Sequence, residues 1–332
     1  MKQVSKGVAP ILAVLVVFAI FLITQGVNPI EIYTSMITSS LTNSYGIGEV
    51  IIKSTPLILV AVATSISAKA GLVNVGGEGQ LVIGALFATY TAVFFVGDMP
   101  SIIGLLCMAL AGMLGGLCWS GIAAILRVKA NMNETITTVI MNYIAYLVVS
   151  VAVYGKLKDP DAFSYPMSPK IADSLKLPTI TGKVSIGIMI ALVVAVGAWY
   201  VLKKTSIGYQ LRVIGGNTQA AIHAGYKVKK VQFCAMLVSG AIAGLAGMIE
   251  ISAVEGRLRT TTGTNYGYYG FLAAWMAWNN PLAAIITSLV IGFLSVAGNV
   301  LEINSGLPSA STQILMAMVL LAILWKGKGE KK

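Results

Sequence analysis

The residue types that carry most enzyme chemistry are scarce in this sequence. His223 is the only histidine among 332 residues, which leaves no His–Asp pairing for a catalytic triad and no two-histidine metal site. The tail GKGEKK lacks the glycine spacing and the hydroxyl residue of a phosphate-binding loop. Cys107, Cys118 and Cys234 lie in apolar runs without metal-ligand spacing, so we interpret them as small packing residues. We therefore predict no catalytic residue, no metal site and no cofactor bound by this chain.

The residues that could bind a small polar molecule lie where glycines interrupt an apolar sequence. In AKAGLVNVGGEGQ, residues 68–80, glycines break the helical periodicity, and Asn74, Glu78 and Gln80 place polar groups beside the break. A carboxylate at membrane depth is costly unless it is paired or faces water. Two interpretations follow: these side chains line a substrate pathway, or Glu78 caps and fixes the unwound backbone.

A second glycine-broken polar segment, residues 256–270, lies in the other half of the chain. Paired broken helices are typical of transporters in which the substrate passes between two repeats. Further pathway candidates are Asn142, Tyr146 and Trp275. An interhelical hydrogen bond is an equal alternative for Asn142. The tyrosines at 266, 268 and 269 fit an interfacial belt as well as an entrance gate.

Composition identifies the elements that must position these side chains. Hydrophobic residues make up 57% of the chain and charged residues 11%, against roughly 25% charged residues in soluble proteins. We predict an all-α polytopic integral membrane protein with about ten transmembrane helices, because the apolar runs approach the roughly 20 residues that cross a bilayer. Residues 1–332 would form a single transmembrane domain with pseudo-repeated halves. The predicted spans cover residues 8–24, 50–68, 81–96, 102–126, 131–155, 184–202, 231–254, 268–278, 281–297 and 309–325.

The stretch from Lys203 to Lys230 lies between two of these spans and carries six basic residues and no acid. Lysine and arginine gather in the cytoplasmic loops of membrane proteins, so we place this loop and both termini in the cytoplasm. The net charge of +11 then reflects topology and needs no nucleic acid partner. Asn217 can cap a short helix over residues 218–224, and Gly225 can end it in a left-handed conformation. A capped helix in a basic loop favours a docking site for a cytoplasmic protein.

Three separated motifs, in order along nearly the whole chain, carry a family resemblance. They are AGLVNVGGEGQLVIGA (70–85), NETITTVIMNYIA (133–145) and GYQLRVIGGNTQAAIHAGYKVKKVQFCAMLVSGAIAGLAG (208–247). Together they resemble permeases of ATP-binding cassette (ABC) importers of the branched-chain amino acid/ribose type. Within that superfamily they are most similar to bacterial nucleoside permeases that work with a basic-membrane-protein-type lipoprotein.

The resemblance implies a permease subunit that translocates nucleosides across the bacterial cytoplasmic membrane. Residues 203–230 would be the coupling loop, seated on a separate cytoplasmic ATPase that binds ATP and Mg. The loop residues that match the family are Gly208, Arg212, Gly216, Asn217, Ala220, Ala221, His223, Ala224 and Gly225. The resemblance also implies a heterodimer with a second permease paralogue, and an extracytoplasmic lipoprotein that delivers the ligand to outer loops, including residues 156–183.

Both the predicted ligand and the predicted energy source have an alternative. Permeases for simple sugars or riboflavin resemble this sequence too, whereas a nucleoside needs flat walls for its base, for which Tyr143, Tyr146 and Trp275 are candidates. An ion-coupled secondary transporter also uses broken helices, and Glu78 and Glu250 would then bind protons or sodium. That class does not need a basic docking helix, so we favour the ATP-driven importer.

Overall fold

The structure is a computed structural model of the chain that describes residues 2–97, 99–162, 165–308 and 310–329. The chain divides into two compact units. Unit 1 comprises Met1–Ser54 and Leu289–Lys332, and unit 2 comprises Thr55–Ser288. The helices α3 and α12 contribute residues to both units, and all the residues of the candidate site lie in unit 2.

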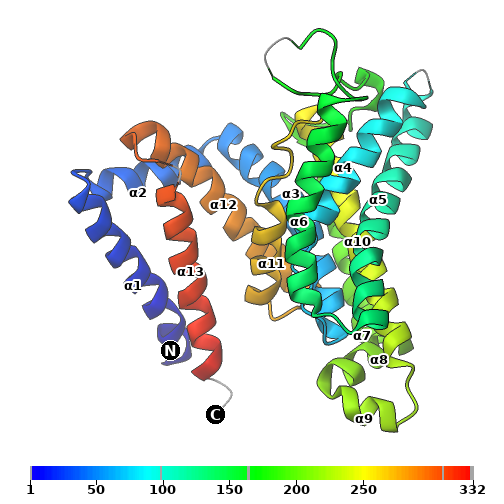
Figure 1. Cartoon of the computed structure of the whole chain (residues 1–332). Coiled ribbons are helices and arrows are strands. Elements are labelled where there is room, and N and C mark those ends of the chain that lie inside the picture. The colour runs from blue at the N-terminus through cyan, green and yellow to red at the C-terminus, as the bar shows by residue number, and fades with distance from the viewer. Residues whose placement is uncertain (1, 98, 163–164, 309, 330–332) are drawn as a thin grey trace. The chain divides into compact units, whose positions relative to one another are not determined.

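Helices make up most of the described residues (Figure 1). The α-helices are α1 (Lys2–Thr24), α2 (Pro29–Ile37), α3 (Ser44–Lys69), α4 (Gly77–Phe94), α5 (Ser101–Ala130), α6 (Glu134–Tyr154), α7 (Gly187–Lys204), α8 (Ser206–Gly216), α9 (Thr218–His223), α10 (Val228–Glu250), α11 (Tyr266–Met276), α12 (Pro281–Ser305) and α13 (Ala310–Gly329). Three short helical turns accompany them: η1 (Thr38–Thr42), η2 (Asp173–Leu175) and η3 (Ile251–Glu255).

Six helices of the described residues are long and apolar enough to cross a membrane, namely α3, α5, α6, α7, α10 with η3, and α12. A seventh span results if the helix pair at residues 13–24 and 29–42 is counted as one span, although the chain bends by 120° between the two helices. The expected ten spans are not confirmed. The predicted eighth span, α11, has only 11 residues, well below the roughly 20 that a bilayer requires. These helix lengths and this apolar composition identify the chain as a multi-pass membrane protein.

An apolar cluster holds unit 1 together. Phe18 and Leu22 of α1 are fully buried against Leu301 of α12 and Leu315 of α13. The turn between α1 and α2 is fixed by Asn28, whose side chain accepts a hydrogen bond from the N–H of Ile30. The outward face of α1 is apolar as well, since Val16, Ile20 and Ile23 are more than half exposed, which suits a helix in contact with lipid.

Small residues let α4, α5 and α10 of unit 2 approach one another closely (Figure 1). A Cβ added at Gly84 or Gly112 would meet the backbone of Gly244, and one added at Gly116 would meet that of Gly240. Membrane helices associate by such van der Waals packing because lipid tails remove the hydrophobic driving force between them. This closely packed trio includes α4, whose start lies in the first glycine break.

Three details differ from the sequence-based expectations. A β-hairpin of β1 (Thr179–Thr181) and β2 (Val184–Ser185) interrupts the all-α pattern at the end of the long loop after α6. The second break ends at residue 265, not 270, because α11 begins at residue 266. Cys118 and Cys234 are exposed, so neither is a packing residue within the chain; they lie on outward faces of α5 and α10.

Candidate functional site

Glu78 lies where the two glycine-broken segments meet. Its carboxylate accepts hydrogen bonds from the backbone N–H groups of Asn265 and Gly267 and from the hydroxyl of Tyr146, each at 2.6 Å. Glu78 is in the first turn of α4, and Asn265 is the N-cap of α11. The carboxylate therefore lies at the positive ends of two helix dipoles. Charge-assisted hydrogen bonds of this kind offset the cost of burying a side chain that is only 1% exposed.

Asn142 of α6 fixes the start of α4 in a similar way. Its Oδ1 accepts the N–H of Gly79 at 2.9 Å, and its Nδ2 donates to the carbonyl of Val75 at 3.0 Å and to the hydroxyl of Tyr268 at 3.3 Å. The first N–H groups of a helix have no partner inside the helix. Asn142 supplies one from a neighbouring helix, which is the interhelical role expected as an alternative to substrate contact.

Asn74 and Gln80 close the same polar cluster on the side of α10. Asn74 Nδ2 donates to the hydroxyl of Ser239 at 3.1 Å and to Gln80 Oε1 at 3.4 Å. Asn74 Oδ1 accepts the N–H of Gly76 at 2.9 Å and Gln80 Nε2 at 3.2 Å. Both side chains are buried. The polar groups that interrupt the apolar sequence thus satisfy one another and the unwound backbone.

Five of the six predicted pathway residues lie in this one cluster around the start of α4: Asn74, Glu78, Gln80, Asn142 and Tyr146. Trp275 does not join it. Its ring lies 5.7 Å from that of Phe271 on α11, and 40% of the residue is exposed. Tyr143 is 66% exposed and joins the edge of the cluster only through a side-chain hydrogen bond with Tyr268. The polar atoms of the cluster already bond to one another and to the backbone, and their role in transport stays a prediction.

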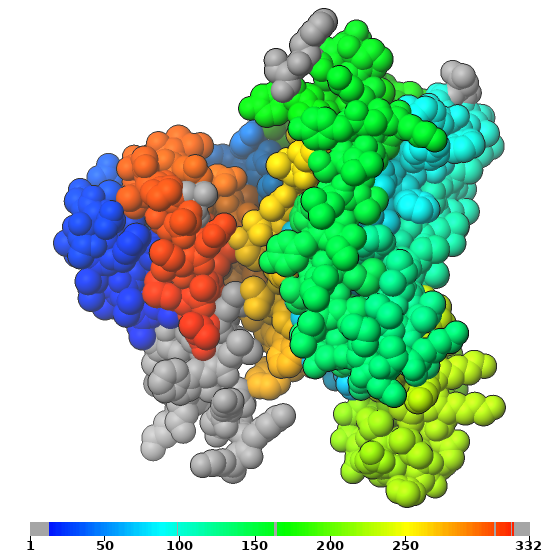
Figure 2. Space-filling view, viewed as in Figure 1, coloured from blue at the N-terminus to red at the C-terminus, as the bar shows by residue number. Residues whose placement is uncertain are grey.

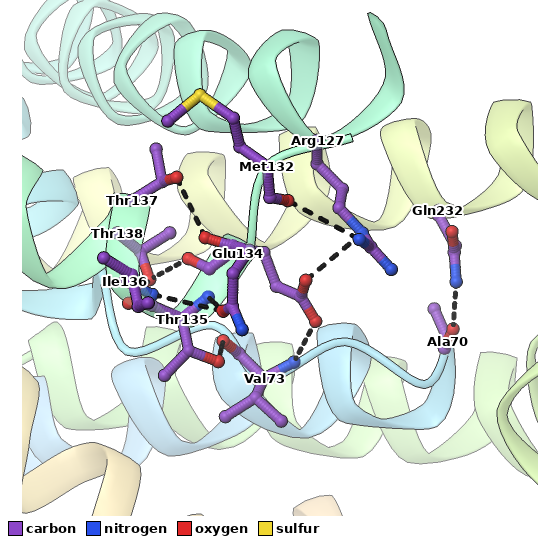
Figure 3. Close-up of polar contacts among 11 residues, drawn as sticks. Ala70, Val73, Arg127, Met132, Glu134, Thr135, Ile136, Thr137, Thr138 and Gln232 are labelled. Atoms are coloured by element: carbon purple, nitrogen blue, oxygen red, sulfur yellow. Dashed lines mark hydrogen bonds and ion pairs between the residues drawn. The ribbon is translucent and has the colours of Figure 1, made fainter. Parts of the chain in front are cut away.

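The other end of the first break is tied to the turn between α5 and α6 (Figure 3). Glu134 Oε1 accepts the N–H of Val73 at 3.4 Å, and its Oε2 lies 3.2 Å from Arg127 Nε. Thr135 donates its hydroxyl to the carbonyl of Val73 at 3.3 Å. Residues 70–76 are therefore held by side chains from outside the break along most of their length.

The basic loop folds into a helical hairpin of α8 and α9, and the capping signals predict only its second helix, α9. Asn217 Oδ1 accepts the N–H of Ala220 at 3.0 Å at the start of α9, and Gly225 follows the helix with φ +82°. The helix ends at residue 223, one residue before the predicted end. Sequence reasoning missed α8, which Thr205 caps by accepting the N–H of Gly208. The capping threonine and the apolar residues of α8 are the signals that could have identified it.

Burial divides the predicted coupling residues into two groups. Ala221 is fully buried in a small core with Ile214 and Val228. Gly208 is buried, and the exposed Arg212 donates to the carbonyl of Leu202. The remaining residues of the set are exposed: Gly216, Asn217, Ala220, His223, Ala224 and Gly225.

The α8–α9 hairpin stands out from unit 2 as a protrusion (Figure 2). Ile222 lies on α9, and 51% of it is exposed. A protein that docks on the hairpin would bury this side chain in the apolar core of the interface. Its apolar character within a basic stretch is the sequence signal that we did not use.

The hairpin contacts the first break directly. Gly71 has φ +77°, and a Cβ there would lie 3.2 Å from the Cα of Gly215 on α8. A Cβ on Gly215 would lie 3.0 Å from the backbone nitrogen of Gly71 and would collide with the carbonyl of Lys69. Gln232 of α10 donates to the carbonyl of Ala70 at 3.2 Å. Movement of α8 would therefore press on the segment that leads to Asn74 and Glu78.

The second break is held by the long loop after α6. Three backbone N–H groups of that loop donate to carbonyl groups before and within the break at 2.9 Å each: Ser168 to Leu258, Ile171 to Gly256 and Leu177 to Ser252. Arg257 and Asp159 add an ion pair at 3.7 Å. Sequence patterns gave no sign of these contacts, because most are made by the backbone and all join residues that lie far apart in the sequence. The loop and the second break thus form one structural element.

Within the part of the chain that the structure describes, no three His, Cys, Asp or Glu side chains come together in a group that could hold a metal ion. The site consists instead of hydrogen-bonding groups around two helix N-termini, joined to an exposed helical hairpin.

Residues 46–324 match the family model described as branched-chain amino acid transport system/permease component. The glucose ABC transporter permease protein TsgB13 of Haloferax volcanii is 32% identical, over 96% of this chain and 86% of that protein. The guanosine ABC transporter permease protein NupP of Bacillus subtilis is 30% identical, over 97% and 94%. The nucleoside ABC transporter permease protein NupB of Lactococcus lactis is 26% identical, over 98% and 92%. A second permease protein of each of the latter two bacteria also matches the chain.

Proposed function

The chain belongs to the permease-component family of branched-chain amino acid transport systems, and on that premise we propose that it is the membrane-spanning permease subunit of an ATP-driven nucleoside importer. A separate ATPase subunit supplies the energy, and ATP with Mg binds to that partner. The permease lies in the bacterial cytoplasmic membrane with both termini in the cytoplasm, and it carries no hydrolytic site of its own.

The contact between α8 and the first break is the observation that carries this proposal. The protruding helix α9 is capped at Asn217 and rests on Ala221, which gives it the rigidity to transmit a push. Gly215 passes displacement of the hairpin to Gly71, since the two backbones touch without side chains between them. ATP binding would close the ATPase pair and move the docked hairpin, and this movement would switch access between the two sides of the membrane.

Nucleosides are the proposed cargo because relatives named for guanosine and for nucleosides align with nearly the whole chain. Sugar is the second candidate, since the similar protein of Haloferax volcanii is named for glucose. Riboflavin is a third ligand class in the same architecture. In each case the polar cluster around Glu78 would provide groups for hydroxyls of the cargo once its internal hydrogen bonds open.

The proposed assembly contains three further proteins. The ATPase docks on residues 203–230, and a second permease paralogue completes a heterodimer. Paired permease proteins in Bacillus subtilis and Lactococcus lactis support that arrangement. A substrate-binding lipoprotein docks outside on the loop at residues 156–183, which is hydrogen-bonded to the second break and so has a direct route to Glu78.

The decisive experiment is ATPase activity and labelled-nucleoside uptake in proteoliposomes that contain this chain with its co-purified partners. We expect nucleosides to stimulate hydrolysis, and uptake to require ATP. Stimulation by a sugar or a flavin and not by nucleosides would support an ATP-driven importer with a different substrate. Uptake driven by an ion gradient in the absence of any ATPase would overturn the proposal.

A further inference from the structure

A hollow of about 830 Å³ lies on the surface of unit 2, where α7 and α10 meet α8. This size falls within the roughly 300–1,000 Å³ of ligand pockets. None of the polar residues around Glu78 lines the hollow, and neither does Ile222 of α9. The hollow is therefore distinct from the polar cluster around Glu78, and it borders the root of the α8–α9 hairpin, where Gly225 lines it.

The wall of the hollow is apolar and open. Val201 of α7 and Val238 of α10 are 40% and 49% exposed. Gly197 also lines the wall, and a Cβ there would meet no heavy atom within 4 Å. Both helices are long and apolar enough to span the membrane. Their exposed faces are therefore suited to hydrocarbon and not to water.

The mouth of the hollow is basic. Lys227 and Lys230 line it together with Gln210, and both lysines are exposed. No acidic residue lines the hollow, and neither lysine takes part in an ion pair within the described part of the chain. Basic groups beside an apolar groove between membrane helices match the charge and shape of an anionic lipid.

We propose that this hollow binds an anionic phospholipid. Its acyl chains lie along α7 and α10, and its phosphate group is held between Lys227 and Lys230. A zwitterionic lipid binds less well, because its headgroup carries a positive charge that offsets the phosphate. The lipid occupies the root of the α8–α9 hairpin, so its binding stiffens the element that would dock the ATPase.

Native mass spectrometry of the purified chain, titrated with phosphatidylglycerol or phosphatidylcholine, tests the proposal. We expect selective retention of phosphatidylglycerol. The double substitution Lys227→Gln/Lys230→Gln should weaken that retention by roughly tenfold, since each lysine near a lipid headgroup contributes to binding. Lys229→Gln is the matched control, because Lys229 is exposed in the same stretch but does not line the hollow.

Gly197→Leu tests the apolar part independently of charge. The leucine would project into open space, fill the groove and displace the acyl chains, so retention of phosphatidylglycerol should fall while both lysines remain. Equal retention of the two lipids, or retention unchanged in both variants, would overturn the proposal. Loss of the lipid when the chain is co-purified with its partner subunits would also overturn it, and would identify the hollow as a protein interface.

Discussion

The carboxylate of Glu78 accepts the backbone N–H of Gly267 at 2.6 Å across 189 residues of sequence. This bond joins the first turn of α4 to the first turn of α11, so the two glycine breaks end at the same point. The three groups that the carboxylate contacts at 2.6 Å are all donors. An ionised carboxylate accepts only, which suits this position better than an amide with its own donors.

Glu78→Ala should destabilise the junction of the breaks strongly, and Glu78→Gln should do so moderately. Alanine leaves the N–H groups of Asn265 and Gly267 without their acceptor, at roughly 1–3 kcal/mol for each buried group. Glutamine keeps one acceptor oxygen but turns an amide toward donors. Thermal unfolding of the purified chain measures the order of stability of the variants, with Glu302→Ala as a control at an exposed acidic residue.

Transport assays on the same variants separate the cap from a substrate contact. If Glu78→Gln assembles normally yet loses uptake, the carboxylate acts on the cargo or on the conformational switch. If uptake falls only as far as the amount of assembled complex falls, the cap accounts for the whole effect.

Gly215→Val should uncouple ATP hydrolysis from uptake. The added side chain would push α8 away from Gly71 and from the carbonyl of Lys69, while the exposed tip of α9 stays free to dock. Gly97→Val is the control outside the docking loop, because a Cβ there would meet only the carbonyl of Ala92, at 3.8 Å. We expect the Gly215 variant to hydrolyse ATP with little uptake in proteoliposomes. Equal uptake in the two variants would show that the glycine contact transmits no movement.

Ile222→Ser should weaken binding of the ATPase without unfolding the hairpin. The Ile222 side chain is half exposed and is not part of the small core around Ala221, so its replacement should leave the hairpin folded. Burial of an isoleucine side chain in the interface would contribute about 1.5–3 kcal/mol to binding. Ile180→Ser is the control, since Ile180 is 56% exposed on β1 in the loop after α6. Co-purification of the ATPase with each variant provides the measurement, and equal yields would exclude Ile222 from the interface.

Local signals predicted α9 of the basic loop well because the structure of that helix is local. The cap at Asn217 and the left-handed Gly225 act within one turn of α9, so residue types alone determine them. Local signals could not show that Ala221, one of the residues matched to the coupling loop, is buried. Its burial depends on Val228 after the turn, and a bulky side chain there would disrupt the hairpin itself.

Long-range partners explain what the sequence could not predict. Glycines and polar residues indicated where both breaks lie. They could not indicate that Glu78 accepts hydrogen bonds from residues 265 and 267, because the hydrophobic period of a helix carries no information about its neighbours in space. The end of the second break was misplaced for the same reason: the glycines at 267 and 270 indicate a break, yet Glu78 caps a helix there. Trp275 was expected near the cluster and packs on Phe271 instead.

At the turn between α5 and α6, we expect Glu134→Ala to lower the free energy of unfolding more than Arg127→Ala does. The ion pair joins an Arg127 side chain that is 37% exposed to a Glu134 side chain that is 12% exposed, and pairs with such access to solvent contribute about 0.2–1 kcal/mol. Glu134 also accepts the N–H of Val73, which only the glutamate substitution leaves without that acceptor. A double-mutant cycle, read from unfolding free energies, should give a coupling energy below about 1 kcal/mol. Lys129→Ala is the control at an exposed base near the same helix end. Equal costs for the two single variants would mean that the bond from Val73 to Glu134 adds nothing measurable to stability beyond the ion pair.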